Sequence, residues 1–159
     1  MDNSPKQTIN KTIDGLNKKN IEAFLVETED EAKKKFFEIL PEGAEILNNS
    51  STTLDILGIS EEITNSGKYD AVKNKLMSMD RKTQSRDMQR IGAAPEWSAG
   101  SAHAVTQGGE IMIASNSGSQ IPGYAYGSDH VLLVVGTQKI VESKDEGIKR
   151  IYEHSLVLE

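Results

Sequence analysis

The chain has 159 residues, of which 36% are hydrophobic and 26% are charged, so it is long enough for one globular domain. Its net charge of −6 argues against a nucleic-acid-binding surface, because phosphate binding depends mainly on Lys and Arg. The sequence has no cysteine, no apolar run near the ~20 residues of a membrane helix and no secretory signal at its amino terminus. We therefore expect a cytoplasmic protein without disulfides, cysteine-held metal clusters or a membrane segment.

The first part of the chain has the pattern of alternating helices and strands. Apolar residues spaced three and four apart predict a helix over about residues 5–19, and the apolar residues 21–26 predict a mostly buried strand. Thr28 and Glu31 have the spacing of a capping box, which predicts the start of a second helix. Residues 44–48 predict another strand. A strand, a capped helix and a strand form a βαβ unit, which implies a parallel sheet with helices on its faces.

The later part of the chain is neutral and rich in glycine, with no Lys or Arg in residues 91–138. The continuous apolar runs at residues 111–114 and 131–135 predict strands that are covered on both faces. Ser143 and Glu146 repeat the capping-box spacing and predict a final helix. The sequence contains no internal repeat. We predict one α/β domain.

Three stretches of the sequence carry a resemblance to a known family. They are Ser51-Thr52-Thr53-Leu54 with Gly58, Ala104-Val105-Thr106-Gln107-Gly108-Gly109-Glu110, and the stretch from Gly127 through Gly136 to Lys139-Ile140-Val141. In this order and spacing they resemble the LUD domain family, which is named for bacterial lactate utilisation. The resemblance extends to the end of the chain at Leu158-Glu159.

The resemblance implies a single LUD-type domain over residues 1–159. It implies a fold similar to that of sugar-phosphate isomerases and coenzyme A transferases (NagB/RpiA/CoA transferase-like). This is a three-layer α/β/α arrangement with an open, mostly parallel sheet. One departure concerns the loop at residues 116–120, which ends in Ser119 and Gln120 where many relatives have Asn and Arg. Without the guanidinium group of that arginine, we expect an anionic ligand to bind less tightly at this position.

The resemblance also implies a role in organic-acid metabolism, because relatives accompany iron–sulfur proteins that oxidise lactate to pyruvate. We expect a small-ligand-binding accessory protein of lactate utilisation, whose ligand is a small organic acid, a sugar phosphate or an acyl-coenzyme A. Two alternatives stay open. One is an enzyme that acts on a sugar phosphate or an acyl thioester through a carboxylate base or nucleophile. The other is a scaffold subunit of an iron–sulfur redox complex. The family brings no defined catalytic residues, and the sequence indicates no cofactor.

Three loops are predicted to meet at the carboxyl edge of the parallel sheet, where open α/β sheets bind ligands. The first is residues 48–53, the second is residues 97–103, and the third pairs Thr106 and Glu110 with residues 116–120. Small polar residues and glycines in these loops offer hydroxyl and backbone donors, although the same residue types also form helix caps and turns. The candidate ligand-binding residues are Ser50, Ser51, Thr52, Thr53, Gly100, Ser101, Thr106, Ser117, Gly118, Ser119 and Gln120.

Glu110 and His103 are the candidate catalytic residues. A carboxylate beside two glycines acts as a base or nucleophile if burial raises its pKa. The stronger interpretation is a turn residue facing water, because residues that enter a strand lie away from its carboxyl edge. His103 titrates near neutrality, yet a lone histidine in a turn of small residues is more often structural. The three histidines lack metal-ligand spacing, so we predict no metal site. Tyr124 and Tyr126 either cover a pocket or belong to the core or an oligomer contact.

Overall fold

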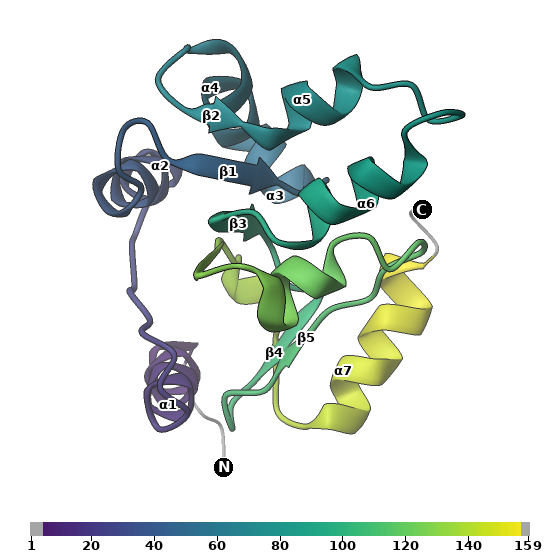
Figure 1. The fold of residues 1–159 in the computed structure, drawn as a ribbon. Coiled ribbons are helices and arrows are strands. Elements are labelled where there is room, and N and C mark those ends of the chain that lie inside the picture. The colour runs from purple at the N-terminus through teal and green to yellow at the C-terminus, as the bar shows by residue number, and fades with distance from the viewer. Residues whose placement is uncertain (1–4, 157–159) are drawn as a thin grey trace. The chain divides into compact units, whose positions relative to one another are not determined.

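The computed structural model describes residues 5–156, so Leu158 and Glu159, which the family resemblance includes, lie outside the described residues. The chain divides into two compact units (Figure 1). Unit 1 comprises residues 1–25, 102–114 and 135–159, and unit 2 comprises residues 26–101 and 115–134. We keep the single LUD-type domain over residues 1–159 as a prediction.

Unit 2 is built on a four-stranded parallel sheet. Its strands are β1 (Glu45–Asn48), β2 (Asp70–Ala71), β3 (Trp97–Gly100) and β6 (His130–Leu133), in the order β2-β1-β3-β6. All three strand pairs are parallel, and Asn48 of β1 is aligned with Ala99 of β3. Because β1 and β3 run in the same direction, their carboxyl ends lie at the same edge of the sheet.

Helices cover both faces of this sheet. They are α2 (Glu29–Ile39), α3 (Thr52–Ile56), α4 (Ile59–Asn65), α5 (Val72–Ser78), α6 (Ser85–Ala93) and the short π-helical turn η1 (Gly123–Gly127). Side chains alternate between the faces of a strand. Ile46 and Ala99 therefore face one side, in a buried cluster with Leu54 of α3. Ser98 faces the other side, where its hydroxyl contacts Ser128, the residue after η1, at 2.8 Å. The predicted three-layer α/β/α class with a mostly parallel sheet is confirmed.

Local hydrogen bonds explain where α2 begins. The side chain of Thr28 accepts a hydrogen bond from the amide of Glu31 at 3.1 Å, and the Glu31 carboxylate accepts one from the amide of Glu27 at 2.8 Å. These two bonds satisfy amides at the helix start that have no partner within the helix. The capping box predicted from sequence is confirmed.

Unit 1 is built around a smaller, three-stranded sheet. Its elements are α1 (Pro5–Asn17), β4 (Ala104–Thr106), β5 (Ile111–Met112), the 3-10 turn η2 (Thr137–Lys139), β7 (Ile140–Val141), α7 (Lys144–Arg150) and the π-helical turn η3 (Ile151–Ser155). β4 and β5 form an antiparallel hairpin, and β4 pairs with β7 in parallel. The side chain of Ser143 accepts a hydrogen bond from the amide of Glu146 at 3.3 Å and caps α7, as predicted.

The close approach of α1 to the β4–β5 hairpin requires glycine. A Cβ atom on Gly109 would lie 2.3 Å from the backbone of Gly15 in α1, and Gly109 has a φ of +82°. A Cβ atom on Gly15 would lie 2.7 Å from the carbonyl oxygen of Gln107. Since neither position has room for a side chain, the two glycines allow α1 to pack on the turn.

Three strand predictions need correction. Residues 21–26 form no strand, because β1 already has a partner on each side. Residues 97–100, which we predicted as part of a loop, form the fully buried inner strand β3. The run at residues 131–135 contributes to the edge strand β6, where Val131 is 38% exposed, so it is not covered on both faces.

Among residues 5–156, no helix is both long enough and apolar enough to cross a bilayer.

Candidate functional site

The carboxyl edge of β1 and β3 in unit 2 carries a cluster of buried polar groups. It consists of Asn48, Asn49, Gly100 and Tyr124, which we call the sheet-edge cluster. The amide of Asn49 donates a hydrogen bond to the carbonyl oxygen of Ala99 at 2.9 Å, and the Asn49 side chain donates to the same oxygen at 3.4 Å. These bonds fix the chain as it leaves β1 against the end of β3.

Asn48 is the unusual member of this cluster. It is only 1% exposed, yet neither polar atom of its side chain has a hydrogen-bond partner among the described residues. Leaving a buried polar atom without a partner costs about 1–3 kcal/mol. Folded proteins seldom leave such groups unpaired, so the Asn48 amide is a candidate partner for an ordered water or a ligand.

Tyr124 covers the end of β3. Its hydroxyl donates to the carbonyl oxygen of Ala99 at 3.4 Å and makes a side-chain hydrogen bond with Asn49. A Cβ atom on Gly100 would lie 1.8 Å from this hydroxyl, so only glycine at position 100 leaves room for the phenol. Burial raises the pKa of Tyr124, and the hydrogen bond with Asn49 opposes this shift. The phenol is therefore protonated at neutral pH and acts as a donor.

The predicted residues Ser50 to Thr53 form the connection between β1 and α3. Ser51 is the N-cap of α3, where its hydroxyl accepts a hydrogen bond from the amide of Leu54 at 3.4 Å. Ser50 and Thr52 are exposed. The cap role of Ser51 matches the structural alternative stated for this loop. The loop leaves the sheet at the sheet-edge cluster, and Gly100, followed by Ser101, lies at the same edge.

The predicted residues Ser117, Gly118, Ser119 and Gln120 form a turn held by its own hydrogen bonds. The Ser117 hydroxyl donates to the Ser119 hydroxyl at 2.9 Å, and Gly118 has a φ of +72°. The carbonyl oxygen of Gln120 accepts from the amide of Tyr124 at 3.3 Å. The turn is thus connected to the sheet-edge cluster through the backbone that carries Tyr124.

Thr106 and Glu110 belong to unit 1, in the turn between β4 and β5. The Thr106 hydroxyl donates to the Glu110 carboxylate and accepts from the Glu110 amide at 3.1 Å. Lys19 and Lys144 lie 3.8 and 3.7 Å from the same carboxylate. The hydroxyl of Thr106 is the largest cause that lowers the pKa of Glu110, and the two lysines lower it further. The raised pKa that a general base or nucleophile needs is not found.

The side chain of His103 forms a hydrogen bond within unit 1. Its Nδ1 atom accepts a hydrogen bond from the amide of Ala114 at 3.2 Å, which ties the two ends of the hairpin together. The lone pair of Nδ1 is used by this bond, so a proton on the neutral ring is carried by Nε2. In the part of the chain that the structure describes, no group of three or more His, Asp or Glu residues could hold a metal ion.

The sequence prediction included the loop that leaves β1, but it did not name Asn48 or Tyr124 as ligand-binding residues. Asn48 was predicted as the last residue of a strand and the first of the polar loop at residues 48–53, and Tyr124 as a residue that either covers a pocket or belongs to the core or an oligomer contact. A polar residue that ends an otherwise apolar strand, as in Ile46-Leu47-Asn48, was the available signal.

The family model described as the LUD domain matches residues 9–157 of this chain. No curated protein is similar enough to count as a match.

Proposed function

Since this chain belongs to the LUD domain family, we propose that it is a small-ligand-binding accessory protein of organic-acid utilisation, and of lactate utilisation in particular. The proposed ligand site is the sheet-edge cluster of unit 2. The family name supports the metabolic role, and the fold supports the position, because open parallel sheets bind ligands beyond their carboxyl ends.

The observation that carries the proposal is the unpaired amide of Asn48. An amide offers donors on its nitrogen and an acceptor on its oxygen. A hydroxy acid such as lactate offers the complementary groups, since its carboxylate accepts hydrogen bonds and its hydroxyl donates one. Because Asn48 is only 1% exposed, a ligand reaches it only after the residues that cover this edge move.

The absence of Lys and Arg from residues 91–138 limits the affinity of the proposed site. Hydrogen bonds between neutral groups contribute only about 0.5–1.5 kcal/mol each, and opening the edge consumes part of this gain. We therefore expect a dissociation constant on the order of 1 mM rather than 1 μM.

Ligand binding is tested by thermal-shift and calorimetric titration of the full chain with lactate, pyruvate, a sugar phosphate and an acyl-coenzyme A. We expect a saturable response to lactate or pyruvate, and we expect Asn48→Val to abolish it. Asn65→Val at the exposed end of α4 is the matched control and keeps the response. No response to any of the four ligand classes would contradict the proposal.

A second variant tests whether the turn of residues 117–120 belongs to the site. Gln120→Ala is expected to weaken binding of the ligand found above, because it removes the side-chain amide that we propose as a ligand contact but keeps the backbone hydrogen bond to Tyr124. Unchanged affinity would remove this turn from the proposed site and leave Asn48 in it.

Partnership with an iron–sulfur redox protein is a separate part of the proposal. Purification of the tagged chain from a cell grown on lactate, followed by iron analysis and mass spectrometry, tests it. We expect an iron–sulfur protein to co-purify, and its absence under native, anaerobic conditions would contradict this partnership. The catalytic alternative gains no support from Glu110, whose pKa is lowered rather than raised.

A further inference from the structure

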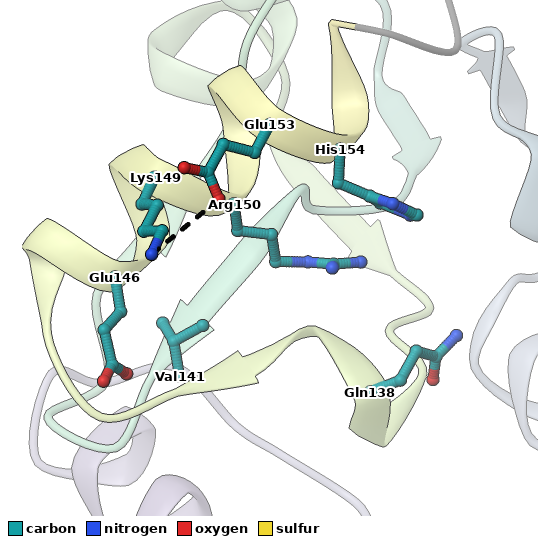
Figure 2. A pocket seen from close by; sticks show the side chains of 7 residues that line it. All are labelled: Gln138, Val141, Glu146, Lys149, Arg150, Glu153 and His154. Atoms are coloured by element: carbon teal, nitrogen blue, oxygen red, sulfur yellow. Dashed lines mark ion pairs between the residues drawn. The ribbon is translucent and has the colours of Figure 1, made fainter.

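A shallow depression lies on the surface of unit 1, where α7 and η3 face the segment of η2 and β7 (Figure 2). Its volume is about 370 Å³. It is lined by Gln138, Val141, Glu146, Lys149, Arg150, Glu153 and His154. The depression has no residue in common with the sheet-edge cluster.

The guanidinium of Arg150 is held in a fixed direction in this depression. Its Nε atom donates a hydrogen bond to the carbonyl oxygen of His103 at 3.0 Å, within unit 1. Figure 2 shows the Arg150 and His154 side chains extending from the helix in the same direction, toward the side on which Gln138 lies. Residues four apart are neighbours on a helix surface. The two terminal amino groups of Arg150 are therefore presented beside an imidazole.

The acidic residues of the depression are already engaged with other groups. The Glu153 carboxylate pairs with Lys149 at 3.9 Å, and the Glu146 carboxylate accepts a hydrogen bond from the amide of Glu142 at 2.8 Å. No carboxylate of residues 5–156 forms an ion pair with Arg150. The positive charge of Arg150 is thus left without an acidic partner in the described structure.

A second cation lies close to Arg150. Burial lowers the pKa of Lys139 in η2, and the charge of Arg150 lowers it further. The charges of Arg150 and Lys139 are therefore close enough to interact.

We propose that this depression is a binding site for a small oxyanion, either a carboxylate or a phosphate group. The terminal amino groups of Arg150 donate to two of its oxygens, which is the bidentate geometry that guanidinium groups favour. His154 and the side-chain amide of Gln138 supply further donors at the rim. The site is independent of the proposed lactate-binding edge, so either proposal can fail without the other.

The test uses the full chain, with inorganic phosphate and acetate as separate probes. Binding is followed by NMR shifts of the Arg150 Nε–H and the His154 ring during titration. We expect saturable shifts of both, and we expect Arg150→Gln to weaken binding about tenfold, the loss of a charged bidentate contact. A response to phosphate alone, or to acetate alone, assigns the site to that class of oxyanion.

Lys11→Gln is the matched control, because Lys11 is an exposed residue of α1 that does not line the depression and its loss changes the net charge by the same amount. Its effect is expected to stay below roughly twofold, since solvent and salt screen the charge of an exposed side chain outside the site. His154→Gln, at an exposed position, provides a variant that keeps the hydrogen bond between Arg150 and His103, and it is expected to weaken binding by roughly threefold. Equal weakening by Arg150→Gln and Lys11→Gln would overturn the proposal, as would the absence of saturable shifts with both probes.

Discussion

Replacing Asn48 by valine tests whether its buried amide is truly unpaired. The substitution removes two polar atoms that have no partner among the described residues and replaces them with methyl groups at a position that is only 1% exposed. Each unpaired atom costs about 1–3 kcal/mol, and the extra volume of valine offsets part of the gain. We expect the free energy of unfolding to rise by about 2 kcal/mol. For a chain of this size the melting temperature then rises by about 4–8 °C.

Asn49→Val is the matched comparison, because Asn49 is the next residue and is also buried. Its side chain makes hydrogen bonds with Ala99 and Tyr124, so its loss is expected to lower the free energy of unfolding by about 1–2 kcal/mol. Urea unfolding followed by circular dichroism measures both variants, with the slope m expected to stay unchanged. If the two substitutions destabilise the chain alike, the Asn48 amide is hydrogen-bonded in solution and our reasoning is refuted.

Two further predictions concern unit 1 and its hairpin. Gly109→Ala should lower the free energy of unfolding by about 3 kcal/mol or more, because its Cβ atom would meet the backbone of Gly15 and its φ is +82°. Gly43→Ala, which has the same φ but open space around it, should cost only about 1 kcal/mol, and equal losses in thermal unfolding would contradict the close-packing argument. The lowered pKa of Glu110 stabilises the fold above the pKa of the unfolded carboxyl, and this contribution is lost as the pH falls through the lower folded pKa. The stability difference between the wild type and Glu110→Gln should therefore shrink between about pH 6 and pH 3, and a difference that stays constant would show that the Thr106 hydroxyl does not lower the pKa of Glu110.

Features that depend on a few neighbouring residues were predicted well from the sequence. The capping boxes of Thr28 and Ser143 were found because a cap involves residues only three positions apart. The family and the α/β class also followed from the sequence. The family depends on the order of the motifs along the chain, and the α/β class depends on the alternation of strand and helix patterns.

Predictions that depended on strand neighbours were less successful. Trp97 to Gly100 consist mostly of small residues, which suggested a loop, yet they form the inner strand β3 because β1 and β6 pair with them on both sides. Residues 21–26 have the apolar pattern of a strand, but they pair with no strand of either sheet. A strand exists only where another strand completes its hydrogen bonds, and the sequence does not show which strands are neighbours.

The chemistry of the site residues likewise depends on contacts between distant parts of the chain. The sequence determined that Glu110 is a carboxylate in a glycine turn. In the structure the hydroxyl of Thr106 lowers its pKa most, and Lys144 and Lys19, which folding places beside it, lower it further. The sequence determined that Asn48 ends an apolar strand, and the structure decided that its amide is buried without a partner. Short-range sequence patterns fix hydrogen bonds within one or two helical turns, whereas burial and charge depend on residues that only folding brings together.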